Sequence, residues 1–401
     1  MAISMRKLKH SLYLTLMKVA VNFAPSASYM AFAGSGSAAQ LCRHIARTGV
    51  KKVLVVTDKP LRELGIVDQA TAAFADVGVE LVIFDEVMPD PTFEQVAAGR
   101  KMMREHACDA VLAVGGGSSI DAAKLIAATS TSEEDPRNWV GFGKVKHEIP
   151  RLYAIPTPSG TGSEATMGAV ISDSVSHEKS IISGAALLPA AAALDPDLLL
   201  GLPAPITAAT GMDALTHGIE AYICIWDRGT RLEHAGAAIK LVFEHLLTAC
   251  NDGANREARE SMSIAAYYAG IAINQVNVGN VHAIAHQVGG KYGIPHGLAN
   301  SLVLPHVLEF CRVEARTRLA ELARLVGAGQ PGDSEEQLAD AFIQAVRDLR
   351  AAVNIPETSD KIKPEDYDRL CELAMAECEG YPVPKLLDRE GTMNILRKIT
   401  G

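Results

Sequence analysis

The sequence predicts two domains, an α/β domain followed by an all-helical domain. Three observations lead to this division. The chain has 401 residues, about the length of two average domains. Between residues 52 and 158, short β-rich runs alternate with helical stretches, which indicates βαβ units and a mainly parallel sheet. After residue 200 the β-rich runs become few and helical segments dominate.

The boundary between the two domains is expected near residue 200. We expect the α/β domain over residues 25–200 and the helical domain over residues 201–401, with residues 1–24 as an N-terminal extension. The expected strands are 53–57, 81–84, 110–114 and 153–156, and the expected helices are 61–77, 93–106, 118–128, 203–224, 234–251, 256–274, 281–292, 313–326, 335–352, 365–378 and 389–399.

Composition places the chain among globular proteins and argues against two other classes. Hydrophobic residues make up 48% of the chain but aromatic residues only 5%, so aliphatic side chains must fill the cores. The net charge of −9 and the lack of a basic stripe argue against a nucleic-acid binder. No uninterrupted apolar run is long enough for a transmembrane helix. The seven cysteines form no CxxC pair and are expected to be reduced thiols of a cytoplasmic protein.

A glycine run joins the third expected strand to its helix. Gly115, Gly116 and Gly117 let the backbone approach a pyrophosphate, and the helix that begins near Ser118 offers unpaired N–H groups and a positive dipole end. A turn that needs glycine only for steric reasons is the alternative.

An acidic residue and a hydroxyl-rich loop add to this candidate cofactor site. Asp58 follows the first expected strand, where a carboxylate accepts hydrogen bonds from a ribose diol and repels the 2′-phosphate of NADP, which favours NAD. The alternative is that Asp58 caps the next helix. Thr157, Ser159 and Thr161 follow the fourth expected strand and suit contacts with phosphate or ribose.

One carboxylate and several imidazoles predict a metal site in the second domain. Asp213 and His217 are four residues apart in an expected helix, so both side chains lie on one face. His282 and His286 form a second such pair, and His296 follows shortly after. This mixture of ligands suits Fe²⁺ or Zn²⁺ better than Mg²⁺ or Ca²⁺. Isolated core histidines are usually structural, but burying this many without a partner is costly.

In their order and spacing these motifs are similar to those of the iron-containing (group III) alcohol dehydrogenases, and the resemblance covers roughly residues 25–401. The matching segments are Gly115-Gly116-Gly117-Ser118 with Asp121 and Lys124, Pro156-Thr157 with Gly160-Thr161-Gly162-Ser163-Glu164, Asp195-Pro196, Ala208 through His217, and His282 through Pro295-His296-Gly297.

The resemblance implies a fold, a ligand set and a reaction. The fold would be a Rossmann-like dinucleotide-binding domain and a helical metal-binding domain, as in dehydroquinate synthase, with the active site in the cleft between them. The reaction would be hydride transfer between NAD and an alcohol or aldehyde at one divalent metal, Fe²⁺ first and Zn²⁺ as the alternative. The implied metal ligands are Asp213, His217, His282 and His296; the implied proton-relay residue is His286; and the cofactor residues are Asp58, Gly115, Gly116, Gly117, Ser118, Asp121, Thr157, Ser159, Thr161 and Lys179.

Three departures from the family pattern concern the substrate. Ile273 stands where Phe is common, Gly168 where some relatives have Asn, and Val383-Pro384-Lys385 where many read Asn-Pro-Arg. The first two changes remove bulk or polarity, so we expect a roomier pocket and medium-chain or long-chain alcohols or aldehydes. The resemblance also implies a homodimer or larger oligomer. A hydroxyacid–oxoacid transhydrogenase, a dehydroquinate-synthase-like lyase and a silent NAD-binding scaffold are the alternatives.

Residues 1–24 lie outside the resemblance and have an amphipathic pattern. Leu8, Leu12, Leu16, Val19 and Phe23 form one apolar stripe, and the segment has four basic and no acidic residues. The segment is expected to pack on the protein's own surface or across a dimer. Peripheral contact with an anionic membrane is the second interpretation, and a mitochondrial presequence, which the scarcity of arginine disfavours, is the third.

Overall fold

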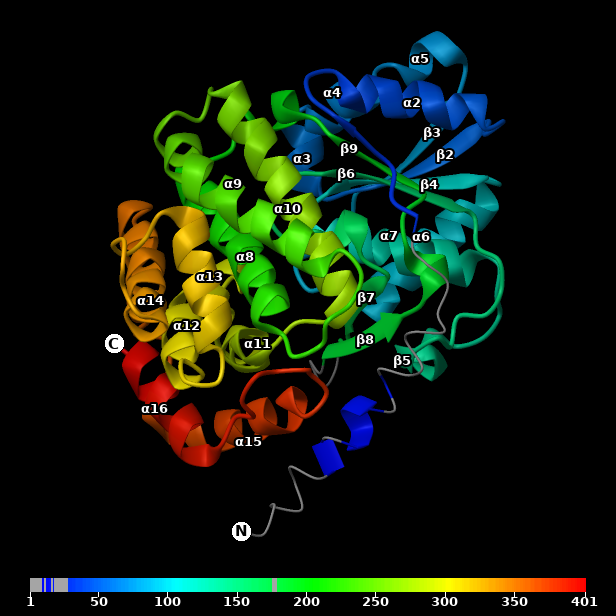
Figure 1. Ribbon diagram of the computed structural model, residues 1–401. Coiled ribbons are helices and arrows are strands. Elements are labelled where there is room, and N and C mark those ends of the chain that lie inside the picture. The colour runs from blue at the N-terminus through cyan, green and yellow to red at the C-terminus, as the bar shows by residue number, and fades with distance from the viewer. Residues whose placement is uncertain (1–8, 11, 16, 18–27, 175–178) are drawn as a thin grey trace. The chain divides into compact units, whose positions relative to one another are not determined.

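The computed structural model describes residues 9–10, 12–15, 17, 28–174 and 179–401 (Figure 1). The chain forms two compact units. The α/β unit consists of the described part of Ser26–Leu202 together with Asp252–Gly270. The helical unit consists of Pro203–Asn251 and Ile271–Gly401 together with the described N-terminal residues. The boundary near residue 200 was expected, whereas the return of residues 252–270 to the α/β unit was not.

A six-stranded parallel sheet forms the centre of the α/β unit, with strand order β1-β9-β6-β4-β2-β3. The four runs expected as strands are the four contiguous strands β6, β4, β2 and β3. The two additional strands, β1 and β9, were not expected, because they consist mainly of alanine, which is a weak signal for a strand. The strands are β1 (Ala31–Ala33), β2 (Lys52–Val56), β3 (Glu80–Phe84), β4 (Ala110–Gly115), β6 (Arg151–Pro156) and β9 (Ala191–Leu194).

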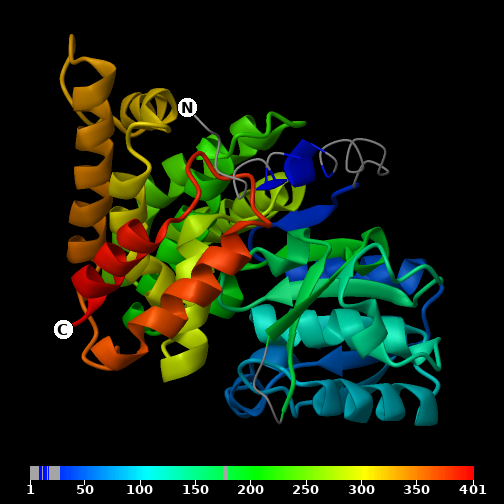
Figure 2. The same cartoon turned by 90° about the horizontal axis from the view of Figure 1, so that it is seen from below.

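Helices cover both faces of this sheet (Figures 1 and 2). Successive residues of β2 point to opposite faces: Val53 and Val55 join one apolar core, and Leu54 and Val56 join the other. The single helix expected over residues 61–77 is broken, because Gly65 adopts a left-handed conformation. The helices are α2 (Ser37–Arg47), α3 (Lys59–Glu63), α4 (Ile66–Thr71), α5 (Phe74–Val77), α6 (Phe93–Glu105) and α7 (Gly117–Ser130).

A second, three-stranded sheet in the same unit has the order β5-β8-β7. It was not expected from the sequence. Its strands are β5 (Gly141–Phe142), β7 (Gly168–Ser172) and β8 (Lys179–Ser183), and short 3-10 turns connect elements of this unit at η1 (Pro136–Trp139), η2 (Ser163–Ala165), η3 (Ala185–Leu187) and η4 (Pro196–Leu199).

The helical unit is built around α8, which packs against α9 and α12. Every helix expected after residue 200 is present within a few residues of its expected bounds. One more, α12, was not expected, because it is apolar on all sides and contains Pro305. The helices are α8 (Ala204–Ile223), α9 (Arg231–Asn251), α11 (Asn280–Tyr292), α12 (His296–Phe310), α13 (Arg316–Val326), α14 (Glu335–Ala352), α15 (Tyr367–Cys378) and α16 (Arg389–Ile399), with the turn η5 (Pro364–Asp366). Helix α10 (Arg256–Val276) begins in the α/β unit and has only its last turns, from Ile271, in the helical unit.

The described residues of the N-terminal segment lie against the helical unit. Leu14 is buried in an apolar cluster with Cys224 and Trp226, and His10 Nε2 lies 3.1 Å from the Tyr381 carbonyl oxygen. Leu12 is exposed. These contacts agree with packing on the protein's own surface, while membrane contact stays an untested prediction. In the part of the chain that the structure describes, no helix is long and apolar enough to span a bilayer.

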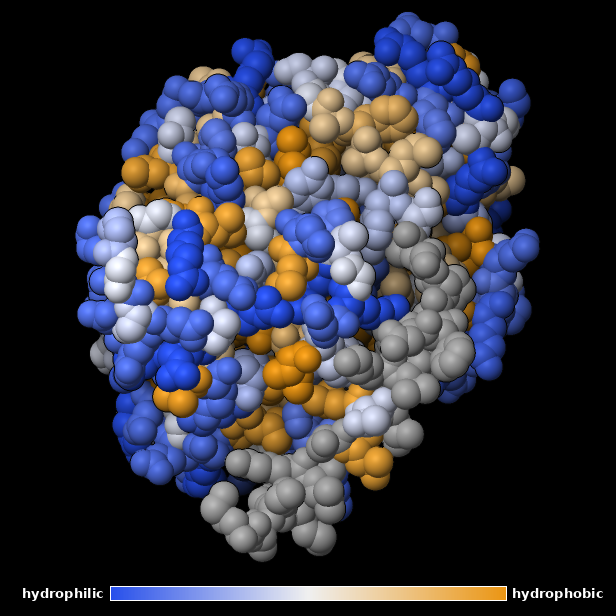
Figure 3. Space-filling view, viewed as in Figure 1, coloured by the Kyte–Doolittle hydropathy of each residue, from blue (hydrophilic) through white to orange (hydrophobic). Residues whose placement is uncertain are grey.

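The molecular surface mixes polar and apolar residues. On the face shown in Figure 3, hydrophobic residues form small groups among hydrophilic ones. Such scattered exposure is ordinary for a globular protein and does not by itself indicate a binding surface.

Two glycines in the α/β unit let a loop and a helix touch through their backbones. Gly162, in the loop after β6, has a φ of +64°, and a Cβ there would lie 2.6 Å from the Cα of Gly270 on α10. A Cβ on Gly270 would in turn overlap the Gly162 carbonyl. This close approach fixes the loop that carries Thr161 and Ser163 against α10.

We therefore expect Gly162→Ala to lower the free energy of unfolding by about 1–3 kcal/mol more than Gly143→Ala. Gly143 has a similar φ of +70° but open space around its Cβ direction, so it reports the backbone strain alone. Chemical denaturation of the two variants measures the difference. An equal loss in both would show that the loop yields without cost.

Candidate metal and cofactor sites

Helix α8 supplies two of the candidate metal ligands. Asp213 and His217 are one helical turn apart on it, and both side chains are buried. Their spacing of four residues brings both to the same face, as the sequence predicts. Glu220 lies three residues after His217 and is buried as well.

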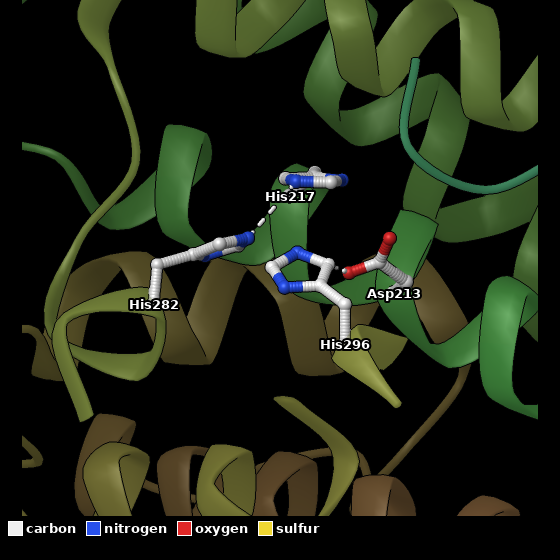
Figure 4. Close-up of side chains that lie close together, drawn as sticks. All are labelled: Asp213, His217, His282 and His296. Carbon is white, nitrogen blue, oxygen red and sulfur yellow. Dashed lines mark hydrogen bonds and ion pairs between the residues drawn. The ribbon is translucent and has the colours of Figure 1, made fainter. Parts of the chain in front are cut away.

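Helices α11 and α12 supply the other two ligands. His282 lies in the first turn of α11 and His296 is the first residue of α12. One ligand atom from each of Asp213, His217, His282 and His296 lies within 4.8 Å of the other three (Figure 4). The structure thus brings together all four residues that the sequence singled out.

A buried carboxylate fixes the orientation of His282. The Nδ1 atom of His282 lies 2.6 Å from Glu220 Oε2, and the Glu220 oxygens also accept hydrogen bonds from the backbone N–H groups of Gly279 and Val281. Burial lowers the pKa of His282 well below its usual range, so the ring is neutral. Glu220 therefore places the single ring proton on Nδ1 and leaves Nε2 as the acceptor, 3.1 Å from Asn300 Nδ2.

The four side chains fit a divalent metal. His282 Nε2 and His217 Nε2 lie only 3.0 Å apart, a contact in which the electron pair of His282 faces a second imidazole nitrogen. Asn300 Nδ2 donates a hydrogen bond to Asp213 Oδ1 at 2.7 Å and so orients the fourth ligand. Burial raises the pKa of Glu220 to about 8, and a cation held by His282 would oppose that rise. One carboxylate with three imidazoles suits Fe²⁺ or Zn²⁺.

His286 lies beside this cluster without being one of its ligands. Its ring centroid is 5.6 Å from that of His282 and 5.5 Å from that of His296. Its Nδ1 atom lies 2.6 Å from Oε1 of Glu377, on α15. The role expected for His286 stays a prediction, and its position next to the ligands is compatible with it.

The glycine run and Asp58 meet at one edge of the sheet. They follow β4 and β2, which are neighbours, and the helices that continue from these strands cover opposite faces. Where the connections from two neighbouring strands leave toward opposite faces of the sheet, a crevice opens at the carboxyl ends of those strands. Gly116 caps α7 and Gly117 begins it, and a Cβ on Gly117 would lie 2.9 Å from Thr161 Cγ2. Gly116, Gly117 and Ser118 stay partly accessible, as a phosphate site requires.

Asp58 is also a helix cap. Its Oδ1 accepts a hydrogen bond from the Leu61 backbone N–H at 2.9 Å, which confirms the capping alternative. Burial raises the pKa of this half-buried carboxyl. Capping uses one carboxylate oxygen, so it does not exclude a ribose contact.

The other residues expected to contact the cofactor have protein partners. Asp121 accepts from Ser163 Oγ at 2.5 Å and from the Val170 backbone N–H at 2.9 Å. Ser159 Oγ lies 2.8 Å from Ser263 Oγ. Lys179, on β8, pairs with Asp90 at 2.6 Å. Thr157 Oγ1 is buried and has no hydrogen-bond partner among the described residues. Their roles toward a cofactor stay predictions.

Lys124 and Glu164 form a buried charged group beneath this loop. Lys124 Nζ donates to Ser163 Oγ at 2.8 Å and to the Gly168 carbonyl oxygen at 2.5 Å, and it pairs with Asp121 at 3.4 Å. Neither carboxyl oxygen of Glu164 has a hydrogen-bond partner among the residues described. Burial raises the pKa of Glu164 to about 7.

Comparison with known proteins identifies the family. The sequence model described as "Iron-containing alcohol dehydrogenase" matches residues 30–196, and that of the C-terminal part of the Fe-containing alcohol dehydrogenase family matches residues 207–400. The chain belongs to the iron-containing alcohol dehydrogenase family. The expectation of an NAD-dependent, metal-containing alcohol dehydrogenase is thereby confirmed at the level of the family.

Named relatives of this iron-containing alcohol dehydrogenase cover nearly its whole length. The 1,3-propanediol dehydrogenase of Citrobacter freundii is 36% identical over 87% of this chain and 92% of its own. The NAD-dependent methanol dehydrogenase of Bacillus methanolicus is 36% identical over 94% and 98%. Among solved structures, a 1,3-propanediol oxidoreductase has a TM-score of 0.90 at 34% identity, covering 94% of this chain and all of its own. The alcohol dehydrogenase of Oenococcus oeni has a TM-score of 0.89 at 33% identity, covering 93% and 100%.

Three residues of this dehydrogenase's site were missed in the sequence. Glu220 and Asn300 follow a ligand by three and four residues, so helical spacing could have found them. Glu377 contacts His286 from 91 residues away, and no sequence signal indicates that contact.

The unusual ionisation of Glu164 gives a prediction about pH. In the folded protein the pKa of Glu164 is about 7, whereas in the unfolded chain it is 4.5. Above pH 4.5 the unfolded chain ionises first, so this group lowers the free energy of unfolding. Relative to Glu164→Gln, the free energy of unfolding of the wild type should fall by about 3 kcal/mol as pH rises from 4.5 to 7. Above pH 7 it should fall no further. Denaturant unfolding across this range measures it, with the exposed Glu63→Gln as control. A difference that is constant with pH would contradict the assignment.

Metal titration of the apo-protein tests the ligand set. His282→Ala removes a ligand and should lower metal affinity by more than the roughly 10–100-fold expected for Glu220→Gln, which removes only the group that orients it. Isothermal titration with Zn²⁺ or Fe²⁺ gives both values, and His106→Ala, exposed in the other unit, is the control. Unchanged affinity in His282→Ala would exclude this cluster as the metal site.

Proposed function

We propose that this iron-containing alcohol dehydrogenase homologue uses Fe²⁺ and NAD(H) to interconvert primary alcohols of medium or long chain and their aldehydes. The observation that carries the proposal is the cluster of Asp213, His217, His282 and His296, whose ligand atoms converge within 4.8 Å and of which the first three side chains are buried. An aspartate and three histidines held this way have no evident use in a silent scaffold, since burying three of them without a cation is costly.

The four ligands would hold the metal, and two further residues hold the ligands. A divalent ion bound here supplies Lewis acidity toward the oxygen of an alcohol or aldehyde. Glu220 keeps the Nε2 electron pair of His282 directed into the cluster. Asn300 holds Asp213 through its 2.7 Å hydrogen bond. Both contacts orient the ligands before any ion arrives, which lowers the entropic cost of binding it.

The α/β unit would hold the dinucleotide at the crevice between β2 and β4. There the backbone N–H groups at Gly116, Gly117 and Ser118 would donate to the pyrophosphate at the start of α7. The Asp58 carboxylate would accept from the ribose diol and repel a 2′-phosphate, so NAD is preferred to NADP. The bound nicotinamide supplies the hydride chemistry.

His286 would exchange the hydroxyl proton. It lies beside His282 and His296 but is not a member of the ligand cluster, so its ring stays available to substrate or water. Alcohol oxidation releases one proton together with the hydride, and a group that accepts this proton must stand near the ligands.

The preference for longer substrates rests on two positions. Gly168, on β7, presents no side chain, and its carbonyl is bound by the buried Lys124. Ile273 is half-buried on α10 and packs against the apolar cluster that contains Leu14. Ile273 stands where Phe is common in the family, and Gly168 stands where some relatives have Asn. One relative, the long-chain-alcohol dehydrogenase 1 of Geobacillus thermodenitrificans, is 35% identical over 81% of this chain and 82% of its own.

The test is a rate profile across aldehydes of increasing chain length, with NADH or NADPH and added Fe²⁺. We expect higher kcat/KM for medium-chain than for two-carbon or three-carbon substrates, and a shift of Ile273→Phe toward short ones. Activity on ethanol or 1,2-propanediol without activity on medium-chain substrates would refute the chain-length proposal. A preference for NADPH would refute the role of Asp58, and oxidation of an alcohol only in the presence of an oxoacid would point to a transhydrogenase.

A further inference from the structure

Three donors converge on the carboxylate of Glu377. Its Oε1 lies 2.6 Å from His286 Nδ1 and 2.6 Å from the Tyr381 hydroxyl, and its Oε2 lies 2.6 Å from Gln287 Nε2. Glu377 lies on α15, which packs against α11, the helix that carries His286 and Gln287. The contacts therefore lie within one compact unit and connect His286 to a helix that contributes no metal ligand.

The chemistry of these partners fixes the ring proton of His286. Tyr381 is buried, and burial together with the neighbouring Glu377 raises the pKa of its phenol well above the usual range, so its hydroxyl stays a donor. Gln287 Nε2 is also a donor. A carboxylate that accepts from both of them accepts from His286 as well, so the imidazole carries its hydrogen on Nδ1. Nε2 is then the acceptor of the neutral ring.

The same arrangement occurs twice on α11. His282 and His286 are four residues apart, and each has its Nδ1 at 2.6 Å from a carboxylate of another helix, Glu220 of α8 for the first and Glu377 of α15 for the second. The first pair directs an Nε2 electron pair toward the metal ligands. The second pair leaves His286 Nε2 without a hydrogen bond to any of the residues that the structure describes.

We propose that Glu377 is a positioning residue of the reaction, which holds His286 in the Nδ1–H tautomer so that Nε2 receives the hydroxyl proton of the alcohol. This inference rests on the proposed role of His286. In aldehyde reduction the same atom returns the proton to the oxygen while the hydride goes to the carbon, so the charges balance. A purely structural role is the alternative. The side chains of His286 and Glu377 are 20% and 25% exposed, and ion pairs with access to solvent contribute little to stability.

Two substitutions separate these roles. Glu377→Leu removes the acceptor, and Glu377→Gln keeps an amide oxygen for Nδ1–H but removes the charge. We expect kcat to fall on the order of 10²-fold in Glu377→Leu and less in Glu377→Gln, with KM close to wild type. Metal content and the NADH dissociation constant should be unchanged. Glu372→Gln, on the exposed part of α15, is the matched control and should behave as wild type.

A second readout does not depend on activity. In metal-free, cofactor-free protein labelled with ¹⁵N-histidine, the imidazole shifts of His286, assigned with His286→Asn, should report Nδ1–H in wild type and in Glu377→Gln. Glu377→Leu should show a mixture of tautomers. If Glu377→Leu fails to fold, Glu377→Gln and Glu377→Asp carry the test through kcat and the same shifts.

Three outcomes decide between the proposals. A kcat near wild type in the folded Glu377 variants, together with a large loss in His286→Asn, would overturn the role of Glu377 alone. Full activity in His286→Asn would overturn the proposed proton transfer and Glu377 with it. An Nε2–H tautomer in wild type would overturn the positioning role whatever the rates.

Discussion

The constraint on which the helical unit depends is the convergence of four candidate metal ligands, three of them buried and His296 accessible. The ligands come from three helices, and two imidazole nitrogens stand 3.0 Å apart. The His282 ring cannot turn away without breaking its buried hydrogen bond to Glu220. The close approach of α12 to α8 depends on Gly297, where a Cβ would overlap the Ala209 carbonyl. Helix packing therefore explains why a glycine follows His296 in the motif Pro295-His296-Gly297.

A second recurring feature of the molecule is that buried polar side chains orient other polar groups through hydrogen bonds. In the helical unit, Glu220 and Asn300 orient the candidate ligands His282 and Asp213. In the α/β unit, the fully buried Lys124 connects Asp121, Ser163 and the Gly168 carbonyl. Lys124 thereby ties α7 to the loop after β6 and to β7, the elements around the expected phosphate site. A buried charge of this kind is tolerated because each of its protons has an acceptor.

The sequence predicted the parts of the fold and site that depend on local pattern. The central strands are continuous apolar runs, and Asp213 with His217, or His282 with His286, share a helical face by spacing alone. It did not predict α12, because Pro305 and an apolar surface on all sides hide its period. It did not predict Glu377 either. Whether a glutamate meets a histidine 91 residues away depends on how α15 packs on α11, which no local pattern encodes.

The ligand set has a consequence for how the protein is made in the cell. Asp213 and His296 are 83 residues apart (296 − 213) and lie on separate helices, so these candidate ligands cannot converge until synthesis has passed α12 and the helices have packed. Metal loading at this cluster would therefore be a late event. With one carboxylate, three imidazoles and no thiolate, the affinities for divalent ions follow the usual order of the first transition series. The metal that a given molecule would acquire then depends on the free ions that the folded chain meets, so catalytic capacity would reflect the cellular metal supply.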